Sequence, residues 1–133
     1  MVRKRRTPNV VDSSAWLAYL AGEPGADRFA AAIEDTKSLV VPAICILEVF
    51  KVALRERGEG DALQAAALMQ QGRVVDLDAA LALEAAKLGL DFKLPLADSI
   101  VYAVANLVTG VVWTQDEHFD GLADVKYYPR RAR

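Results

Sequence analysis

Cysteine and histidine are almost missing from this sequence: Cys45 and His118 are the only residues of their kinds. One cysteine cannot form an internal disulfide, and a structural zinc site normally needs several cysteine or histidine ligands. The sequence therefore excludes a disulfide-stabilised scaffold and argues against zinc. Because Cys45 also lies in an apolar segment, we expect the reducing environment of the cytoplasm.

Long apolar runs, linkers and repeats are missing too. No stretch approaches the roughly 20 apolar residues that cross a bilayer, and Thr7-Pro8-Asn9 stands where a secretion signal would carry apolar residues. We therefore expect no membrane association and no export signal. The chain has 133 residues, of which 53% are hydrophobic and 26% charged, which predicts a single folded domain.

An excess of positive charge is missing, since 16 Lys and Arg stand against 18 Asp and Glu for a net charge of -2, but basic residues gather at the two ends of the chain. We predict a basic N-terminal tail at residues 1–8, one domain at residues 9–129 and a basic C-terminal tail at residues 130–133. Solvated, frayed ends are the simpler interpretation of Arg3–Arg6 and Arg130–Arg133. Contacts with phosphate groups beside an acidic centre are the alternative.

Two hydrophobic spacings alternate along the chain. Short apolar runs predict strands at residues 9–12, 38–41, 73–77, 111–113 and 125–128. Helical spacing predicts helices at residues 13–22, around Phe29 to Ile33, and at residues 43–57, 61–71, 79–88 and 95–110, with a short segment at residues 119–122. We expect Ser13 or Ser14 to cap the first helix and Gly89 to end the fifth.

This alternation predicts an α/β fold with a mostly parallel sheet of five strands and helices on both faces. In such sheets, ligands bind beyond the carboxyl ends of the strands. We therefore expect the functional residues among the polar residues that follow strands or begin helices.

Three carboxylates stand alone in apolar segments. Each is the only charged residue of its segment: Asp12 between Arg6 and Glu23, Glu48 between Lys37 and Lys51, and Asp98 between Lys93 and Asp116. Burying a carboxylate is costly unless it is paired, hydrogen-bonded or bound to a metal, and a divalent cation would offset the mutual repulsion of several. With Asp116, which follows the fourth strand, all four acids are placed to meet at one end of the sheet.

An all-oxygen site of this kind suits Mg²⁺ or Mn²⁺ and the hydrolysis of phosphodiesters. Each acid also has a purely structural interpretation: Asp12 as a helix cap, Glu48 as a partner of Lys51, Asp98 as a first-turn acid and Asp116 as a turn residue. The joint pattern favours the metal site.

The segments that carry these acids resemble those of PIN domains, and more narrowly of VapC-type toxins. They are Val10-Val11-Asp12-Ser13-Ser14-Ala15-Trp16, Leu47-Glu48-Val49, Leu94-Pro95-Leu96-Ala97-Asp98-Ser99 and Trp113-Thr114-Gln115-Asp116. The resemblance covers about Asn9 to Tyr128. It implies a three-layer α/β/α sandwich and a Mg²⁺- or Mn²⁺-dependent endoribonuclease that hydrolyses RNA with a metal-activated water, as the toxin of a type II toxin–antitoxin system.

The resemblance also assigns roles to residues. Asp12, Glu48, Asp98 and Asp116 match the catalytic acids, with Asp12, Asp98 and Asp116 as metal ligands and Glu48 orienting the water. Ser14 and Thr114 would hydrogen-bond the carboxylates. A cognate VapB-like antitoxin and a homodimer are the implied partners. The basic start before the first strand departs from the family, and Glu117 or Asp120 offers another choice of fourth acid.

Other interpretations stay open. A non-catalytic PIN-fold module that binds RNA or protein would keep the fold without the chemistry, and DNA cleavage is not excluded. A phosphatase that forms a phospho-aspartate would carry a second Asp two residues after the first, where Ser14 stands. We expect His118 to be an exposed turn residue, with a general base as the alternative, and Trp16, Tyr19 and Phe50 to pack in the core or at an interface.

Overall fold

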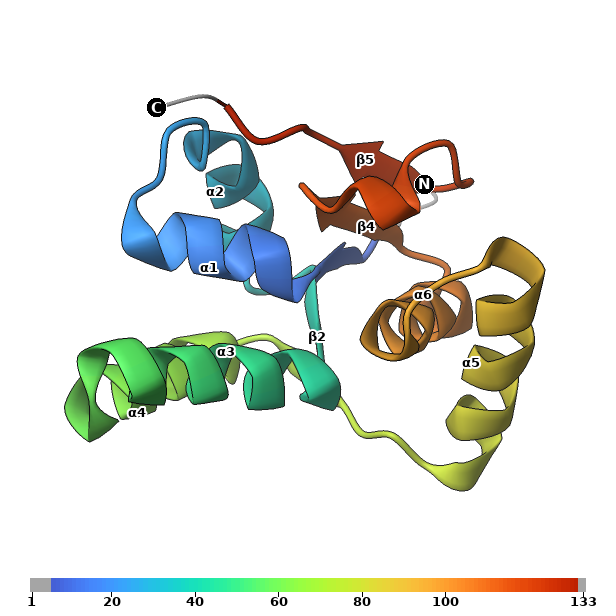
Figure 1. Cartoon of the computed structure of the whole chain (residues 1–133), viewed down its shortest axis with the longest axis horizontal. Coiled ribbons are helices and arrows are strands. Elements are labelled where there is room, and N and C mark those ends of the chain that lie inside the picture. Colours follow the sequence, from blue (N-terminus) through green and yellow to red (C-terminus); the bar gives the residue numbers. More distant parts are fainter. Residues whose placement is uncertain (1–5, 132–133) are drawn as a thin grey trace, which may run out of the picture.

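The computed structural model describes residues 6–131 and contains one five-stranded sheet with helices on both sides. The strands are β1 (Asn9–Val11), β2 (Leu39–Pro42), β3 (Arg73–Val75), β4 (Val111–Thr114) and β5 (Val125–Tyr127). The helices are α1 (Ser13–Ala21), α2 (Asp27–Glu34), α3 (Ala43–Arg57), α4 (Glu59–Met69), α5 (Ala79–Phe92) and α6 (Leu96–Val108), with a 3₁₀ turn, η1 (Glu117–Phe119). The predicted α/β sandwich is confirmed (Figure 1).

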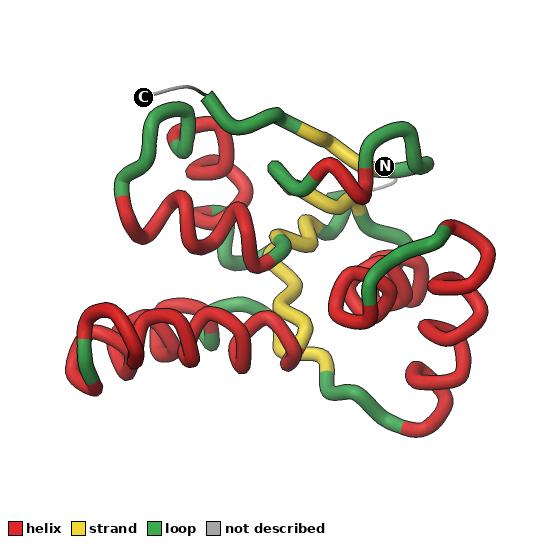
Figure 2. The backbone as a smooth tube through the Cα atoms, in the orientation of Figure 1, coloured by secondary structure: helices red, strands yellow, loops and turns green. Residues whose placement is uncertain are grey.

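The sheet is wound in two directions from its centre. Its strand order is β3-β2-β1-β4-β5, and every adjacent pair is parallel. The chain moves outward from β1 through β2 to β3 and then crosses back to β4. Parallel connections are nearly always right-handed, so this reversal puts α1–α4 on one face and α5 and α6 on the other. Figure 2 shows the strands between these two groups of helices.

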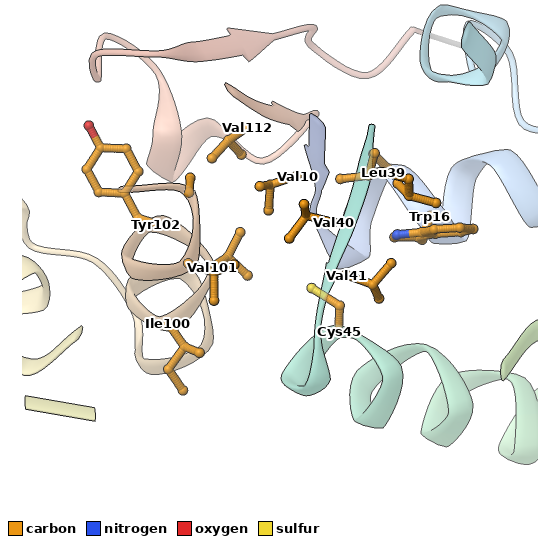
Figure 3. Packing of buried hydrophobic residues seen from close by; sticks show 14 of the residues in the cluster. Val10, Trp16, Leu39, Val40, Val41, Cys45, Ile100, Val101, Tyr102 and Val112 are labelled. Atoms are coloured by element: carbon orange, nitrogen blue, oxygen red, sulfur yellow. The ribbon is translucent and has the colours of Figure 1, made fainter. Parts of the chain in front are cut away.

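Two apolar layers enclose the strands. Successive strand residues alternate in direction, so Val40 points toward α6 while Leu39 and Val41 point toward the side of Trp16 (Figure 3). Trp16 and Cys45 are fully buried, as expected from their apolar surroundings. Within the described residues, no helix combines the length and apolar character that crossing a membrane requires.

Gly89 is the clearest difference from the predicted elements. It does not end a helix: α5 continues to Phe92, and Lys93 ends it in the left-handed conformation with φ 55°. A Cβ at Gly89 would lie 3.3 Å from the Cβ of Ser99, so the glycine lets α5 pack closely on α6. Interhelical contact, and not helix termination, is the physical reason for this residue.

The ends of the described chain pack against the fold. Arg6 forms an exposed ion pair with Asp35 at 3.1 Å, at the edge where β1 begins. That is the edge opposite the carboxyl ends of the strands, so Arg6 does not flank the acids. Arg130 lies 4.0 Å from Glu23 after β5. The predicted basic residues Arg3, Lys4, Arg5 and Arg133 lie outside the described residues.

Candidate active site

The reversal of the sheet falls between β1 and β4, at whose carboxyl ends polar residues meet. Asp12 follows β1 directly, and its backbone N–H donates to the carbonyl of Trp113 in β4 at 3.1 Å. Asp116 comes two residues after β4. Such a topological switch point leaves a crevice that neighbouring loops cannot fill, which is where open α/β sheets bind ligands.

Asp12 is held rigidly by hydroxyl groups and the start of α1. Its Oδ1 accepts from Ser14 Oγ at 2.7 Å and from the Ala15 amide at 3.1 Å, and its Oδ2 accepts from Thr114 Oγ1 at 2.8 Å. Asp12 is therefore the helix cap, and the expectation that Ser13 or Ser14 caps α1 was wrong. The carboxylate accepts a hydrogen bond from a backbone N–H in the first turn of α1, which has no partner within the helix. The serine hydroxyls are therefore free to donate to carboxylates.

Thr114 joins the two acids that follow β1 and β4. Its buried Oγ1 donates to Asp12 and accepts from the backbone N–H of Asp116 at 2.9 Å. Ser14 Oγ likewise accepts from the N–H of Gln115 at 3.3 Å. These two hydroxyls fix the carboxylate of Asp12 and the turn after β4 relative to each other.

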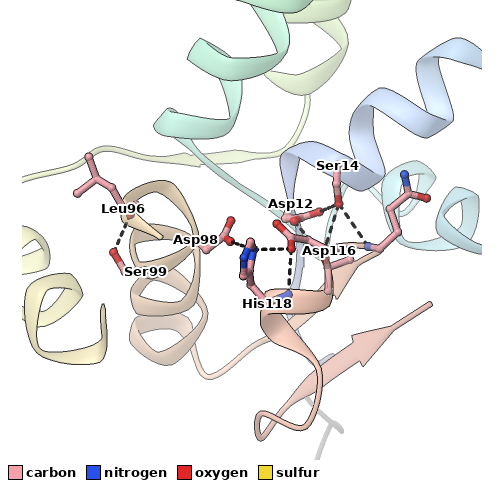
Figure 4. Close-up of polar contacts among 9 residues, drawn as sticks. Asp12, Ser14, Leu96, Asp98, Ser99, Asp116 and His118 are labelled. Atoms are coloured by element: carbon pink, nitrogen blue, oxygen red, sulfur yellow. Dashed lines mark hydrogen bonds and ion pairs between the residues drawn. The ribbon is translucent and has the colours of Figure 1, made fainter. Parts of the chain in front are cut away.

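Asp98 and Asp116 converge from different elements, with His118 between them (Figure 4). Asp98 lies in the first turn of α6, and Asp116 caps η1 by accepting from the N–H of His118 at 2.9 Å. His118 Nδ1 lies 2.8 Å from Asp116 Oδ1 and 3.3 Å from Asp98 Oδ2. The histidine side chain is half exposed, as expected, but its contact with two of the acids was not predicted.

The pKa values of two acids show the cost of this arrangement. Burial raises the pKa of Asp12 to about 6, although its hydrogen bonds lower it and the charge of Asp116 adds to the rise. Burial also raises the pKa of Asp98 to about 7, followed by repulsion from Asp116 and Asp12, while His118 acts in the opposite direction. Asp12, Asp98 and Asp116 therefore share one electrostatic environment.

Glu48 reaches this environment from α3. Its Oε1 accepts a hydrogen bond from Ser13 Oγ at 2.6 Å, so it is fixed beside the residue that follows Asp12. Burial raises the pKa of the Cys45 thiol, and the charges of Asp12 and Glu48 both add to this rise. Neither Asp12 nor Glu48 is among the residues whose donor atoms converge within the described chain, which are Asp98, Asp116 and His118.

The donor atoms fit a hard divalent cation. One ligand atom from each of Asp98, Asp116 and His118 lies within 4.8 Å of the others, and Asp12 is coupled electrostatically to both aspartates. Carboxylate oxygens are the ligands that Mg²⁺ and Mn²⁺ prefer, and imidazole is acceptable to Mn²⁺. A cation here would relieve the repulsion that raises the pKa of Asp98.

Comparison with known families decides the assignment of the fold. The family model of the PIN domain matches residues 10–125. The chain belongs to the PIN domain family. A search against curated proteins finds no significant match.

Solved structures with this fold include toxins and their complexes. A toxin–antitoxin complex from Klebsiella pneumoniae aligns with a TM-score of 0.76 and 20% identity, over 92% of this chain and 99% of the other. Mycobacterium tuberculosis VapC20, described as a sarcin-ricin loop cleaving toxin, gives 0.73 and 19%, over 91% and 99%. DNA-bound VapBC from Salmonella typhimurium gives 0.72 and 14%, over 93% and 98%. At these identities the likeness shows the fold of this PIN domain alone.

Sequence reasoning missed three features of the site. His118 contacts two acids, Ser13 holds Glu48, and Gln115 is buried beside Asp116. The contact between His118 and Asp116 could have been predicted from their spacing, because a side chain two residues after an acid in a turn can fold back on it. No signal in the sequence indicated the other two.

Proposed function

We propose that this PIN domain protein is a metal-dependent endoribonuclease. The observation that carries the proposal is the convergence of Asp98 and Asp116 beside the buried Asp12, at the switch point of the sheet. Acids that repel one another lower the stability of a folded domain, so we expect them to have a function. Binding a divalent cation is the simplest one.

The site residues have separable roles in this proposal. Asp12, Asp98 and Asp116 bind the cation, and the hydroxyls of Ser14 and Thr114 keep Asp12 in one orientation. When bound, Mg²⁺ or Mn²⁺ supplies positive charge that makes a water more acidic and stabilises the departing oxygen. Glu48, with Oε1 held by Ser13, orients the attacking water and accepts its proton at Oε2.

We also propose that the protein is the toxin of a type II pair and that its partner is a VapB-like antitoxin. Similar structures are described as a toxin–antitoxin complex and as a sarcin-ricin loop cleaving toxin, which supports both points. A groove of about 490 Å³ between α1, α3 and α4 offers an apolar docking surface, with walls that include Leu17, Leu20 and Leu68. An apolar antitoxin helix fits such a groove.

Homodimer formation, which the resemblance implies, and the cytoplasmic location expected from the single cysteine remain predictions. Large leucines lie exposed on α5 and α6, among them Leu83, Leu90 and Leu107 at 69%, 83% and 63%. Analytical ultracentrifugation of the purified protein measures its oligomeric state directly.

The decisive experiment compares variants on a labelled RNA pool and on DNA of the same sequence, with Mg²⁺, Mn²⁺ or EDTA. Asp98→Asn is expected to lower cleavage at least about 100-fold. Mutation of a residue that only hydrogen-bonds a metal ligand already costs about 10- to 100-fold in metal affinity or activity, and loss of a ligand is expected to cost more. Asp91→Asn, an exposed acid on α5, is the matched control and is expected to keep full activity. RNA cleavage that survives EDTA or Asp98→Asn would overturn the mechanism.

The toxin assignment has its own readout. Expression of the wild type is expected to arrest growth, and Asp98→Asn or co-expression of a small protein encoded beside it is expected to restore growth. RNA binding without cleavage or growth arrest would favour a non-catalytic PIN-fold module instead.

A further inference from the structure

His118 is the only nitrogen-bearing side chain among those that meet at the acids, and the roles proposed above do not use it. Its Nδ1 lies 2.8 Å from Asp116 Oδ1 and 3.3 Å from Asp98 Oδ2, so the ring stands between the two carboxylates (Figure 4). Asp116 Oδ1 also accepts from the backbone N–H of His118 at 2.9 Å. The short turn η1 therefore holds the ring against both acids.

Nδ1 faces two negative groups but has a single in-plane position for a proton or a metal ion. A proton there is shared unequally, because a hydrogen bond to Asp116 leaves only a longer contact with Asp98. A divalent cation in the same place contacts the nitrogen and both carboxylates, and its charge offsets their repulsion. The arrangement therefore suits a cation better than a proton.

The spacing of the donor atoms fits one shared ion. Neighbouring ligands of an octahedral ion lie about 3 Å apart, because each is about 2.1 Å from the ion. Nδ1 is close to this separation from an oxygen of Asp116 and an oxygen of Asp98. One donor atom from each of the three residues lies within 4.8 Å of the others. His118 can therefore bind the same ion as the two acids without a large movement of the backbone.

A nitrogen ligand changes which ion the site prefers. Mg²⁺ takes oxygen ligands, whereas imidazole is a common ligand of transition metals. Mn²⁺ combines the two preferences, because it is a transition metal and carboxylates suit it as they suit Mg²⁺. A set of carboxylates with one imidazole therefore favours Mn²⁺ over Mg²⁺.

We propose that His118 binds the active-site cation through Nδ1 and makes the site selective for Mn²⁺ over Mg²⁺. The proposal rests on the nuclease function above, which leaves the identity of the ion open. A purely structural His118 would only donate a hydrogen bond to Asp116 or Asp98. The ion would then have oxygen ligands alone, and its selectivity would not depend on the imidazole.

The first test detects the nitrogen directly. His118 is the only histidine of the chain, so a histidine nitrogen bound to Mn²⁺ is assigned without a variant. Untagged protein with ¹⁵N-labelled histidine is loaded with Mn²⁺, and pulsed EPR measures the coupling between the electron spin of the ion and the ring nitrogen. We expect the coupling of a directly bound nitrogen. Mn²⁺ that binds without this coupling, or does not bind, would overturn the proposal.

The second test separates ligation from hydrogen bonding. In His118→Asn the amide keeps a hydrogen-bond donor near the position of Nδ1 but removes the imidazole. EPR of free Mn²⁺ measures the affinity for Mn²⁺, and competition measures the affinity for Mg²⁺. The variant is expected to lower the Mn²⁺ affinity at least about tenfold and the Mg²⁺ affinity less than about threefold. Equal losses for the two ions would overturn the selectivity. Asp91→Asn, an exposed acid on α5, is the control and is expected to keep both affinities.

RNA cleavage separates this proposal from the nuclease function. If Mn²⁺ binds without the nitrogen coupling and RNA is still cleaved, the role of His118 fails while the nuclease function stands. If the coupling is present but RNA is cleaved with neither ion, His118 is still a metal ligand and the nuclease function fails.

Discussion

Asp98 is strained electrostatically when no cation is bound. Its pKa is about 7 in the fold against an ordinary 3.8, so the folded state binds more protons than the unfolded state between about pH 4 and 7. The folded state is therefore penalised as pH rises through this window, and above about pH 7 the penalty is complete.

Asp98→Asn removes that penalty, because asparagine is neutral at every pH. In EDTA at pH 8 the variant is expected to be more stable than the wild type by at least ~1 kcal/mol, since one unit of pKa corresponds to about 1.4 kcal/mol. At pH 5 the gain is expected to be smaller. Urea unfolding at both pH values measures the difference; a variant less stable than the wild type at pH 8 would contradict the assigned environment.

The acids of the site were predictable, whereas the residues that support them were not. Asp12, Glu48 and Asp98 stand out because each interrupts an apolar run, and this isolation is visible without coordinates. The contacts of Ser13 and His118 depend on side-chain distances across elements. The orphaned amide of Gln115 depends on burial by neighbours that are remote in sequence.

Glycines separate what local patterns can and cannot predict about helices and strands. Gly22 and Gly58 follow α1 and α3, where the helices predicted at residues 13–22 and 43–57 come to an end, and each has a positive φ. Gly89 lies inside α5, where a neighbouring helix requires it. A single sequence does not distinguish a terminating glycine from a packing one, since the partner surface is far along the chain.

Gly110 is a stronger case of the same kind, because it precedes β4 where the chain passes β1. An added Cβ would lie 2.8 Å from the carbonyl oxygen of Pro8, which cannot move without disturbing the strand pairing. Gly110→Ala is therefore expected to destabilise the fold by about 1 to 3 kcal/mol. Thermal unfolding measures this loss.

Gly60→Ala is the matched control for Gly110→Ala. Nothing lies within 4 Å of an added Cβ at Gly60, which lies in the first turn of α4. Alanine there is expected to leave stability unchanged or to raise it by up to about 1 kcal/mol. Equal effects of the two substitutions would show that backbone freedom, and not the contact with Pro8, decides the outcome.

At the scale of the whole molecule, the acidic site joins segments that the chain otherwise keeps apart. Asp12 lies between β1 and α1, Asp98 lies in the first turn of α6 and Asp116 follows β4. Alternating strands and helices predicted the parallel sheet, but the order β3-β2-β1-β4-β5, which brings these acids together, is a tertiary property. Because the acids follow strands or lie near the starts of helices, the sequence predicted that they meet at one end of the sheet, but it did not predict the strand order that brings them side by side.

A cation that joins these segments is expected to stabilise the whole fold. Unfolding separates the ligands, so a bound ion adds RT ln(1 + [M]/Kd), about 2.7 kcal/mol at a concentration 100 times Kd. For a chain of this size the melting temperature is expected to rise by about 10 °C.

At pH 5 the rise is expected to be smaller, because Asp12 and Asp98, with pKa values of about 6 and 7, are then mostly protonated in the metal-free fold. Calorimetry with Mn²⁺ tests this, with Asp91→Asn expected to match the wild type and Asp98→Asn to lose most of the rise. A rise that is equal at pH 5 and pH 8, or that survives in Asp98→Asn, would mean that the ion binds elsewhere.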